Sequence, residues 1–165
     1  MKPEIRDAIP ADVPAILDLV RGLAAFEKLT HEVSATEKLL GDALFPAHGT
    51  PDAKCALAVV DGEPAGYALW FPTFSTFLAK PGLYLEDIFV KPELRRRGIG
   101  RALLLHVAAL ASSRGCGRLE WTVLDWNRPA IEFYASLGAT TLPDWRICRL
   151  TGGALARYAG HEAGA

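Results

Sequence analysis

Membrane spans, signal peptides and internal repeats are all missing from this sequence. No apolar run reaches the ~18 residues that a membrane helix needs, and repeats and low-complexity tracts are absent. The first residues, MKPEIRDAIPADVP, are too acidic and too poor in apolar side chains for a secretory signal. With 165 residues, 50% of them hydrophobic, the chain predicts one globular domain over residues 1–165, in the cytoplasm and without a membrane partner.

Cysteines and histidines are few, and neither residue type has the spacing of a metal site. The three cysteines include no C-x-x-C pair, and the four histidines form no H-E-x-x-H pattern. We therefore expect no disulfide framework and no bound metal, and reduced, buried thiols rather than a catalytic one. These residues are Cys55, Cys116 and Cys148, and His31, His48, His106 and His161.

Net charge is also nearly absent, at −1, but the two signs are unevenly distributed. Residues 1–90 hold 13 acidic and 7 basic side chains, whereas residues 91–165 hold 6 acidic and 11 basic ones. The split favours an anionic partner for the C-terminal half and a cationic one for the N-terminal half. A random distribution of charges produces similar asymmetry, so the charge split indicates a ligand only together with a binding motif.

Hydrophobic periodicity predicts strands mixed with helices, and hence an α/β or α+β fold. The hairpin prediction depends on Asp61-Gly62, between two apolar runs over residues 55–74. The other predicted strands are 4–8, 82–90, 118–126 and 145–150. Five helices are predicted. They begin at Asp12, after a Ser34/Glu37 capping box, near Ile99, at Asn127 and at Gly153. The helix at Asn127 has Pro129 in its first turn and Gly138 after its end.

The segment PELRRRGIGRALL, residues 92–104, joins a predicted strand to a predicted helix. Arginines, closely spaced glycines and a helix N-terminus together favour a pyrophosphate ligand, although a basic turn exposed to solvent is the simpler alternative. The chain lacks the G-x-x-x-x-G-K-[ST] string, and the dinucleotide pattern G-x-G-x-x-G fails at Leu103. What remains is R-x-x-G-x-G, formed by Arg95, Gly98 and Gly100.

Two longer stretches extend this pattern into a family resemblance. YLEDIFVKPELRRRGIG and, after it, VLDWNRPAIEFYASLGA resemble the GNAT superfamily of acyl-CoA-dependent N-acyltransferases, in particular its spermidine/spermine (diamine) and thialysine N-acetyltransferase branch. The resemblance covers roughly residues 4–159. It implies a mixed, mostly antiparallel twisted sheet, splayed at its centre and flanked by helices, and acetyl-CoA as co-substrate.

The resemblance also implies which residues bind coenzyme A. Main-chain groups of one strand would pair with the pantetheine arm, and the arginine-glycine turn would hold the pyrophosphate. Asn127 would contact the cofactor near the strand end, although capping a helix is an alternative role for it. Arg96 departs from the family, which often has glycine there. The strand residues are Ile88, Phe89 and Val90, and the turn residues are Arg95, Arg96, Arg97, Gly98, Ile99, Gly100 and Arg101.

For catalysis, the resemblance assigns the general acid to Tyr134, which would protonate the departing thiolate. An amine with a pKa near 10 must lose a proton before it attacks, so a carboxylate is needed, and Glu86, acting through water, is the expected base. The amine would attack the thioester directly, with the amides of residues 88–90 polarising its carbonyl. There is a structural alternative for each residue. Tyr134 could pack in the core without a catalytic role, and Glu86 could be a strand-end carboxylate that pairs with an arginine.

The acceptor is expected to be a small cationic amine that binds near Glu27, Glu86 and Asp87. Lys28 and His31 dilute the negative charge there, which favours a short primary amine over a long polyamine. Alternatives are another amine (an amino acid, an antibiotic or a protein N-terminus), a non-catalytic acyl-CoA-binding module, or nucleic-acid binding through the arginines, which the near-neutral total charge disfavours. The resemblance further implies a homodimer.

Overall fold

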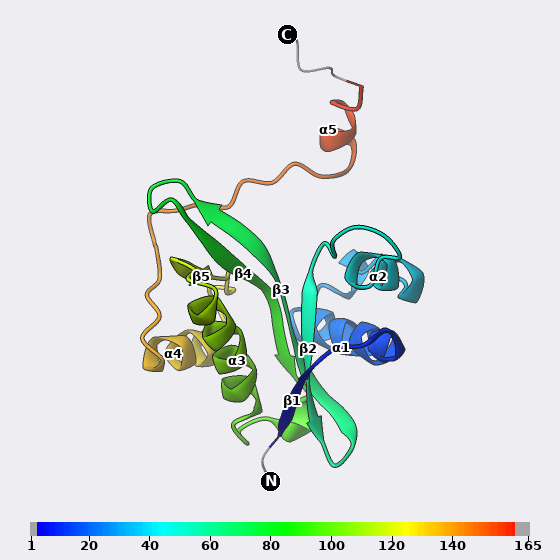
Figure 1. Ribbon diagram of the computed structural model, residues 1–165, viewed down its shortest axis with the longest axis vertical. Coiled ribbons are helices and arrows are strands. Elements are labelled where there is room, and N and C mark those ends of the chain that lie inside the picture. The colour runs from blue at the N-terminus through cyan, green and yellow to red at the C-terminus, as the bar shows by residue number, and fades with distance from the viewer. Residues whose placement is uncertain (1–2, 161–165) are drawn as a thin grey trace. The chain divides into compact units, whose positions relative to one another are not determined.

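The computed structural model describes residues 3–160, which include a five-stranded sheet with the strand order β1-β2-β3-β4-β5 (Figure 1). All neighbouring strands are antiparallel except β4 and β5, which are parallel. This mixed, mostly antiparallel sheet with flanking helices confirms the predicted fold class. The strands are β1 (Glu4–Asp7), β2 (Lys54–Val60), β3 (Glu63–Ser75), β4 (Lys80–Val90) and β5 (Arg118–Glu120).

The chain divides into two compact units, with the boundary between Thr122 and Val123. The first unit contains the sheet and the second contains two helices. The single domain therefore stays a prediction. The helices of the first unit are α1 (Val13–Phe26), α2 (Glu37–Leu44) and α3 (Ile99–Ser113), with short 3₁₀ turns η1 (Pro10–Asp12), η2 (Thr30–Glu32) and η3 (Pro92–Leu94); those of the second are α4 (Arg128–Ser136) and α5 (Gly152–Ala156).

Helices cover both faces of the sheet in the first unit (Figure 1). On one face, Ile16 and Leu19 of α1 join Tyr67 and Phe89 of the sheet in a buried cluster. On the other face, the ring of Trp70 on β3 meets the ring of His106 on α3, with 6.2 Å between their centroids. Alternating side chains of β3 therefore contact α1 or α3, as expected for a strand buried on both sides.

The hairpin predicted at Asp61-Gly62 is confirmed. These residues join β2 to β3, and both have positive φ angles, 54° and 84°. Two consecutive left-handed residues define the type I′ turn, whose twist matches that of the flanking strands. The turn therefore sets the first pairs of the β2–β3 ladder, Val60 with Glu63 and Val59 with Pro64, before a bulge shifts the register between Ala58 and Val59.

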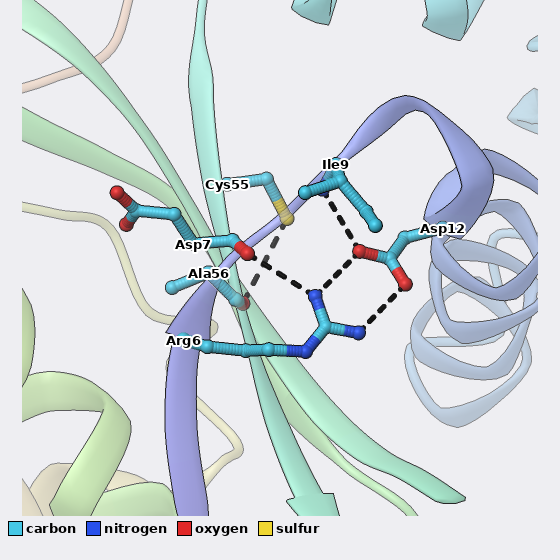
Figure 2. Close-up of polar contacts among 6 residues, drawn as sticks. All are labelled: Arg6, Asp7, Ile9, Asp12, Cys55 and Ala56. Carbon is cyan, nitrogen blue, oxygen red and sulfur yellow. Dashed lines mark hydrogen bonds and ion pairs between the residues drawn. The ribbon is translucent and has the colours of Figure 1, made fainter.

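An ion pair joins β1 to the turn that starts α1 (Figure 2). The guanidinium of Arg6 donates from Nη1 and Nη2 to the two carboxylate oxygens of Asp12, at 2.7 and 2.8 Å. The backbone N–H of Ile9 also donates to Asp12 Oδ2, at 2.8 Å. The hydrogen bond from Arg6 is the main reason that the pKa of Asp12 lies below its ordinary value.

Three local predictions were wrong. The helix α2 is capped by Thr36, whose Oγ1 accepts from the N–H of Leu39 at 3.2 Å, rather than by a Ser34/Glu37 box. Of the predicted strand 118–126, only β5 is formed. Residues 145–150 belong to no strand in the described part of the chain, because a strand pattern forms a ladder only where a neighbouring backbone is within reach.

No helix among the described residues is long and apolar enough to cross a membrane.

Candidate active site

The turn that was predicted to bind pyrophosphate connects η3 to α3. Gly98 occupies the N-cap position of α3 with φ = 78°, and Arg96 has φ = 62°. A Cβ atom added to Gly98 would meet nothing within 4 Å, and one added to Gly100 would meet only Cγ2 of Val90, at 3.7 Å. Because the first-turn amides of a helix have no partner within it, this turn presents backbone donors to an accessible space.

The left-handed conformation of Arg96 gives a physical reason for the glycine that the family often has there. A side chain at this φ carries steric strain, which glycine avoids. The side chains of Arg96, Arg97 and Arg101 are exposed, and none of them pairs with a carboxylate among residues 3–160. Three guanidinium groups beside the turn are therefore available to an anion.

Arg95 differs from the other arginines because it packs against the first unit's core. Its Nε donates to the carbonyl oxygen of Val90 at 3.1 Å. Its guanidinium carbon lies 4.4 Å from the centroid of the Phe26 ring and 5.5 Å from that of Phe89. Such cation–π contacts with α1 and β4 anchor the turn, a role that the sequence did not indicate.

One edge of β4 is open over most of its length. The strand β5 pairs only with Gly82, Leu83 and Tyr84, so residues 85–90 have no strand partner on that side within the described chain. The strands β4 and β5 therefore separate after Tyr84, and this separation is the splay that the family resemblance implied. It leaves part of β4 as a free edge that can receive an extended ligand.

The main chain of β4 alternates between this edge and β3. The N–H of Lys91 donates to the carbonyl of Ala65 on the β3 side, at 2.9 Å. By the alternation of an antiparallel ladder, the main-chain groups of Phe89 also face β3, whereas those of Ile88 and Val90 face the open edge. Of the three residues predicted to pair with pantetheine, Ile88 and Val90 therefore have the required orientation.

Glu86 lies at a bulge in β4. Leu69 faces Asp87, and its neighbour Trp70 faces Leu85, so that Glu86 has no partner on β3. In a regular strand without a bulge, residues 85, 87 and 89 would lie on one face of the sheet. With the bulge, Leu85 shares the α3 face with Trp70, while Asp87 lies on the α1 face, and the side chain of Glu86 is exposed.

Asp87 and Glu27 are the two carboxylates of this region with altered pKa values. Asp87 accepts a hydrogen bond at Oδ2 from the hydroxyl of Tyr67, at 2.9 Å. Burial raises the pKa of Asp87, the Tyr67 hydrogen bond partly opposes this, and Glu86 raises it further. Burial, and then the charge of Asp87, raises the pKa of Glu27 at the end of α1. The structure thus places Glu27 close enough to Asp87 for their charges to interact, and acceptor binding by the two stays a prediction.

Cys55 lies on the buried face of β2 and shares this environment. Burial raises the pKa of its thiol to about 12, with the charges of Asp12 and Asp87 adding to the effect. A thiol with that pKa stays protonated at neutral pH and is a poor nucleophile. No group of three or more metal-binding side chains occurs among residues 3–160.

Tyr134 and Asn127 belong to the second unit. Tyr134 is a half-buried residue of α4, and its ring lies 5.4 Å from the ring of Phe133, centroid to centroid. Asn127 occupies the N-cap position, where its carbonyl accepts from the N–H groups of Ala130 and Ile131, but its side chain makes no capping hydrogen bond. The alternative role of Asn127 as a side-chain cap is therefore not observed.

Tyr67 is a residue of this region that sequence reasoning missed. In the pattern GYALWF it reads as one more core position of a buried strand, and it is indeed 0% exposed. Its function as a hydrogen-bond donor depends on the β3–β4 register and on the bulge at Glu86. Neither can be read from the sequence of a single strand.

Comparison with known proteins agrees with this geometry. Residues 20–139 match the family described as the acetyltransferase (GNAT) family. An L-ornithine N5-acetyltransferase from Arabidopsis thaliana is 39% identical over 92% of this chain and 85% of that protein. A thialysine N-epsilon-acetyltransferase from Bos taurus is 39% identical over 94% of this chain and 96% of its own length.

Among solved structures, an integron cassette protein from the mobile metagenome of V. cholerae superposes with a TM-score of 0.75. It is 26% identical, and the match covers 96% of this chain and 98% of that one. The relatives include the thialysine-acetylating kind that the sequence resemblance named. The chain therefore belongs to the acetyltransferase (GNAT) family and is an acetyl-CoA-dependent N-acetyltransferase.

Proposed function

We propose that this enzyme moves the acetyl group of acetyl-CoA directly onto a primary amine of a small cationic acceptor, such as a thialysine-like or ornithine-like amino acid or a diamine. The observation that carries the proposal is the sequence of features along β4 and α3. A free strand edge leads from two carboxylates, Glu86 and Asp87, to a turn with accessible amides and unpaired arginines. The relatives that act on ornithine and thialysine support this class of acceptor.

In this proposal the turn binds the pyrophosphate of coenzyme A. The amides of Gly98, Ile99 and Gly100 donate to phosphate oxygens, and the helix dipole of α3 favours their negative charge. Arg96, Arg97 and Arg101 supply charge-assisted hydrogen bonds. Arg95 contributes by anchoring the turn to Phe26 and Phe89.

The pantetheine arm then pairs with the free edge of β4 as an added strand would. Ile88 and Val90 offer their main-chain groups to it, while Phe89 stays bonded towards β3. An amide of this edge polarises the thioester carbonyl and stabilises the negative charge that develops on its oxygen. Asn127 contributes a further contact to the cofactor.

The chemistry needs one base and one acid. Glu86, which is exposed at the bulge, accepts the proton of the acceptor's ammonium through a water molecule. The amine nitrogen attacks the thioester carbon and loses a second proton to water, which later reprotonates Tyr134. The C–S bond breaks, and the phenol of Tyr134 gives its proton to the leaving thiolate. A phenol pKa near 10 and a thiol pKa of about 8.5 make this last transfer only slightly unfavourable.

Acceptor binding is assigned to carboxylates. Glu27 and Asp87 attract the ammonium groups of the acceptor, and Glu86 directly precedes Asp87 in the chain. The cluster has few carboxylates, and Lys28 follows Glu27 immediately. A short acceptor with one or two cationic groups therefore suits it better than a long polyamine.

A thiol-release assay tests the proposal. Acetyl-CoA is supplied with thialysine, L-ornithine, a simple diamine, spermidine and an aminoglycoside, and free coenzyme A is measured. We expect the highest kcat/KM with the short acceptors. Turnover confined to the aminoglycoside, or absent with all of these amines, would contradict the proposed acceptor class.

A further inference from the structure

A fully buried tyrosine holds one of the carboxylates assigned to the acceptor. The hydroxyl of Tyr67 donates to Oδ2 of Asp87 at 2.9 Å, and the residue has no exposed surface. Tyr67 lies directly opposite Phe89 in the β3–β4 ladder, on the face that packs against α1. Burial, and then the charge of Asp87, raises the pKa of this phenol, so that it remains a donor at every physiological pH.

The surroundings of Asp87 are rich in acidic groups. Glu27 at the end of α1 and the Cys55 thiol on β2 are both close enough for the charge of Asp87 to raise their pKa values, and Glu86 precedes Asp87 on β4. None of these carboxylates forms an ion pair with a lysine, arginine or histidine among residues 3–160. A half-buried carboxylate without a counter-ion is costly, and a cationic ligand would neutralise that cost.

A neutral donor is also the appropriate partner for a carboxylate that must bind a cation. A lysine or arginine in the place of Tyr67 would cancel the charge of Asp87 and repel an ammonium group. The hydroxyl of Tyr67 fixes the orientation of the carboxylate and stabilises its charged form, yet it leaves the negative charge uncancelled. It occupies Oδ2, so that Oδ1 remains for a second donor.

We propose that Tyr67 is a positioning residue for the acceptor: its buried hydroxyl holds Oδ2 of Asp87, so that Oδ1, together with Glu27, binds an ammonium group of the substrate. This inference rests on the proposed function, because it concerns the binding of the acceptor in that reaction. Tyr67 itself does not touch the substrate. It acts by keeping Asp87 charged and in one orientation.

The test is Tyr67→Phe, which removes the hydroxyl and keeps the ring. With L-ornithine as the acceptor, we expect KM for the acceptor to rise about tenfold, the factor for loss of one hydrogen bond to a charged group. We expect KM for acetyl-CoA and kcat to stay near their wild-type values. Without its donor, Asp87 binds a proton more readily, so the acidic limb of the kcat/KM profile should move to higher pH.

Tyr84→Phe is the matched control. Tyr84 is a half-buried residue of β4 that stacks on Phe71, with 5.3 Å between the ring centroids. The Tyr84→Phe variant also loses one phenol hydroxyl, and it should leave kcat, KM for the acceptor and the pH profile unchanged. Equal behaviour of the two variants would overturn the inference.

A double-mutant cycle with Asp87→Asn separates positioning from packing. If Tyr67 acts through Asp87, the effect of Tyr67→Phe on KM should largely disappear in the Asp87→Asn background. Full additivity would contradict the inference. Should Tyr67→Phe not fold, wild type and Asp87→Asn still test the inference: acceptor affinity, measured by calorimetry with coenzyme A present, should rise with pH in the wild type and rise less steeply in Asp87→Asn, because Glu27 is still present. Equal pH dependence in the two proteins would contradict the inference.

These outcomes are distinct from a failure of the proposed function. If the wild-type enzyme acetylates neither ornithine nor the other amines, the acceptor class is wrong. If the wild type is active while Tyr67→Phe keeps the wild-type KM and pH profile, only the role of Tyr67 is wrong.

Discussion

At the scale of single residues, one bulge gives two neighbouring carboxylates different environments. Glu86 is exposed, whereas Asp87 is held by a buried hydroxyl on the α1 face of the sheet. The sequence indicated both residues as candidates, because the family motif contains them. It could not distinguish their environments, because the extra residue in β4 is defined only by its pairing with β3.

The glycine of the turn leads to the first prediction. Gly98→Ala should raise the dissociation constant of acetyl-CoA about tenfold, because its methyl group would occupy space that the proposal gives to the pyrophosphate. The control is Gly62→Ala, at the β2–β3 turn. Both glycines have positive φ angles, 78° and 84°, and neither would place a Cβ within 4 Å of another group.

Because the backbone strain is matched, each of these two variants should lose about 1 kcal/mol of stability. Only Gly98→Ala should lose cofactor affinity, as measured by calorimetry. Wild-type affinity in Gly98→Ala, or an equal loss in Gly62→Ala, would contradict the assignment of the turn.

Tyr134→Phe tests the proposed acid. Removing a general acid should lower kcat about a hundredfold, while the affinity for acetyl-CoA stays close to the wild-type value. Steady-state kinetics and calorimetry provide the two measurements, and Tyr84→Phe serves again as the control. Unchanged turnover would remove Tyr134 from the mechanism.

At the scale of elements, local sequence signals predicted those features that depend on local chemistry. Asp61-Gly62 specified a type I′ hairpin, and Gly138, with φ = 88°, follows α4 as expected. The strand predictions beyond residue 120 were wrong, because alternation shows that a segment can pair but not whether a partner is near. The anchoring of Arg95 between two rings also required the folded arrangement of α1 and β4.

The contact between β1 and η1 gives a prediction about stability. Asp12→Ala should lower the free energy of unfolding by about 2 kcal/mol, because the variant loses two hydrogen bonds from Arg6 and one from Ile9. Asp42→Ala is the control: its pair with Lys38 is as short, at 2.6 Å, but exposed to solvent. We expect the control to lose much less stability, because solvent screens an exposed ion pair.

The pH dependence of this effect has a definite sign. The pKa of Asp12 is lower in the folded state, so its contribution is present above the ordinary carboxyl pKa and disappears as pH falls through the folded-state value. Urea unfolding at neutral and at acidic pH should therefore show the difference between wild type and Asp12→Ala shrinking in acid. A difference that is constant with pH would argue for packing rather than charge.

At the scale of the whole molecule, the second unit has apolar side chains that its own residues do not cover. Trp145 is 77% exposed and Ile147 is 69% exposed, within residues 145–150, which have a strand pattern and no strand partner in the described chain. Exposed apolar groups of this kind commonly mark an interface between proteins. The homodimer that the family resemblance implied therefore stays a prediction, and these side chains are where we expect its interface.

We expect sedimentation analysis of the wild type to give twice the chain mass of 17.8 kDa. A double variant, Trp145→Ser with Ile147→Ser, should shift the enzyme towards the monomer, because it removes apolar area from the interface. Leu39→Ser, at a 59% exposed position of α2, should leave the mass unchanged. A monomeric wild type would contradict the prediction.

The hydrogen bond between Arg95 and Val90 has a consequence for the order of events during cofactor loading. The carbonyl oxygen of Val90 faces the open edge of β4 and already has a donor. A ligand that pairs at this last rung must share the second lone pair of that oxygen or release the guanidinium from it. If the guanidinium of Arg95 is released, binding of the pantetheine arm and loosening of the arginine-glycine turn would be a single coupled step. The pantetheine and pyrophosphate ends of the cofactor would then not bind independently.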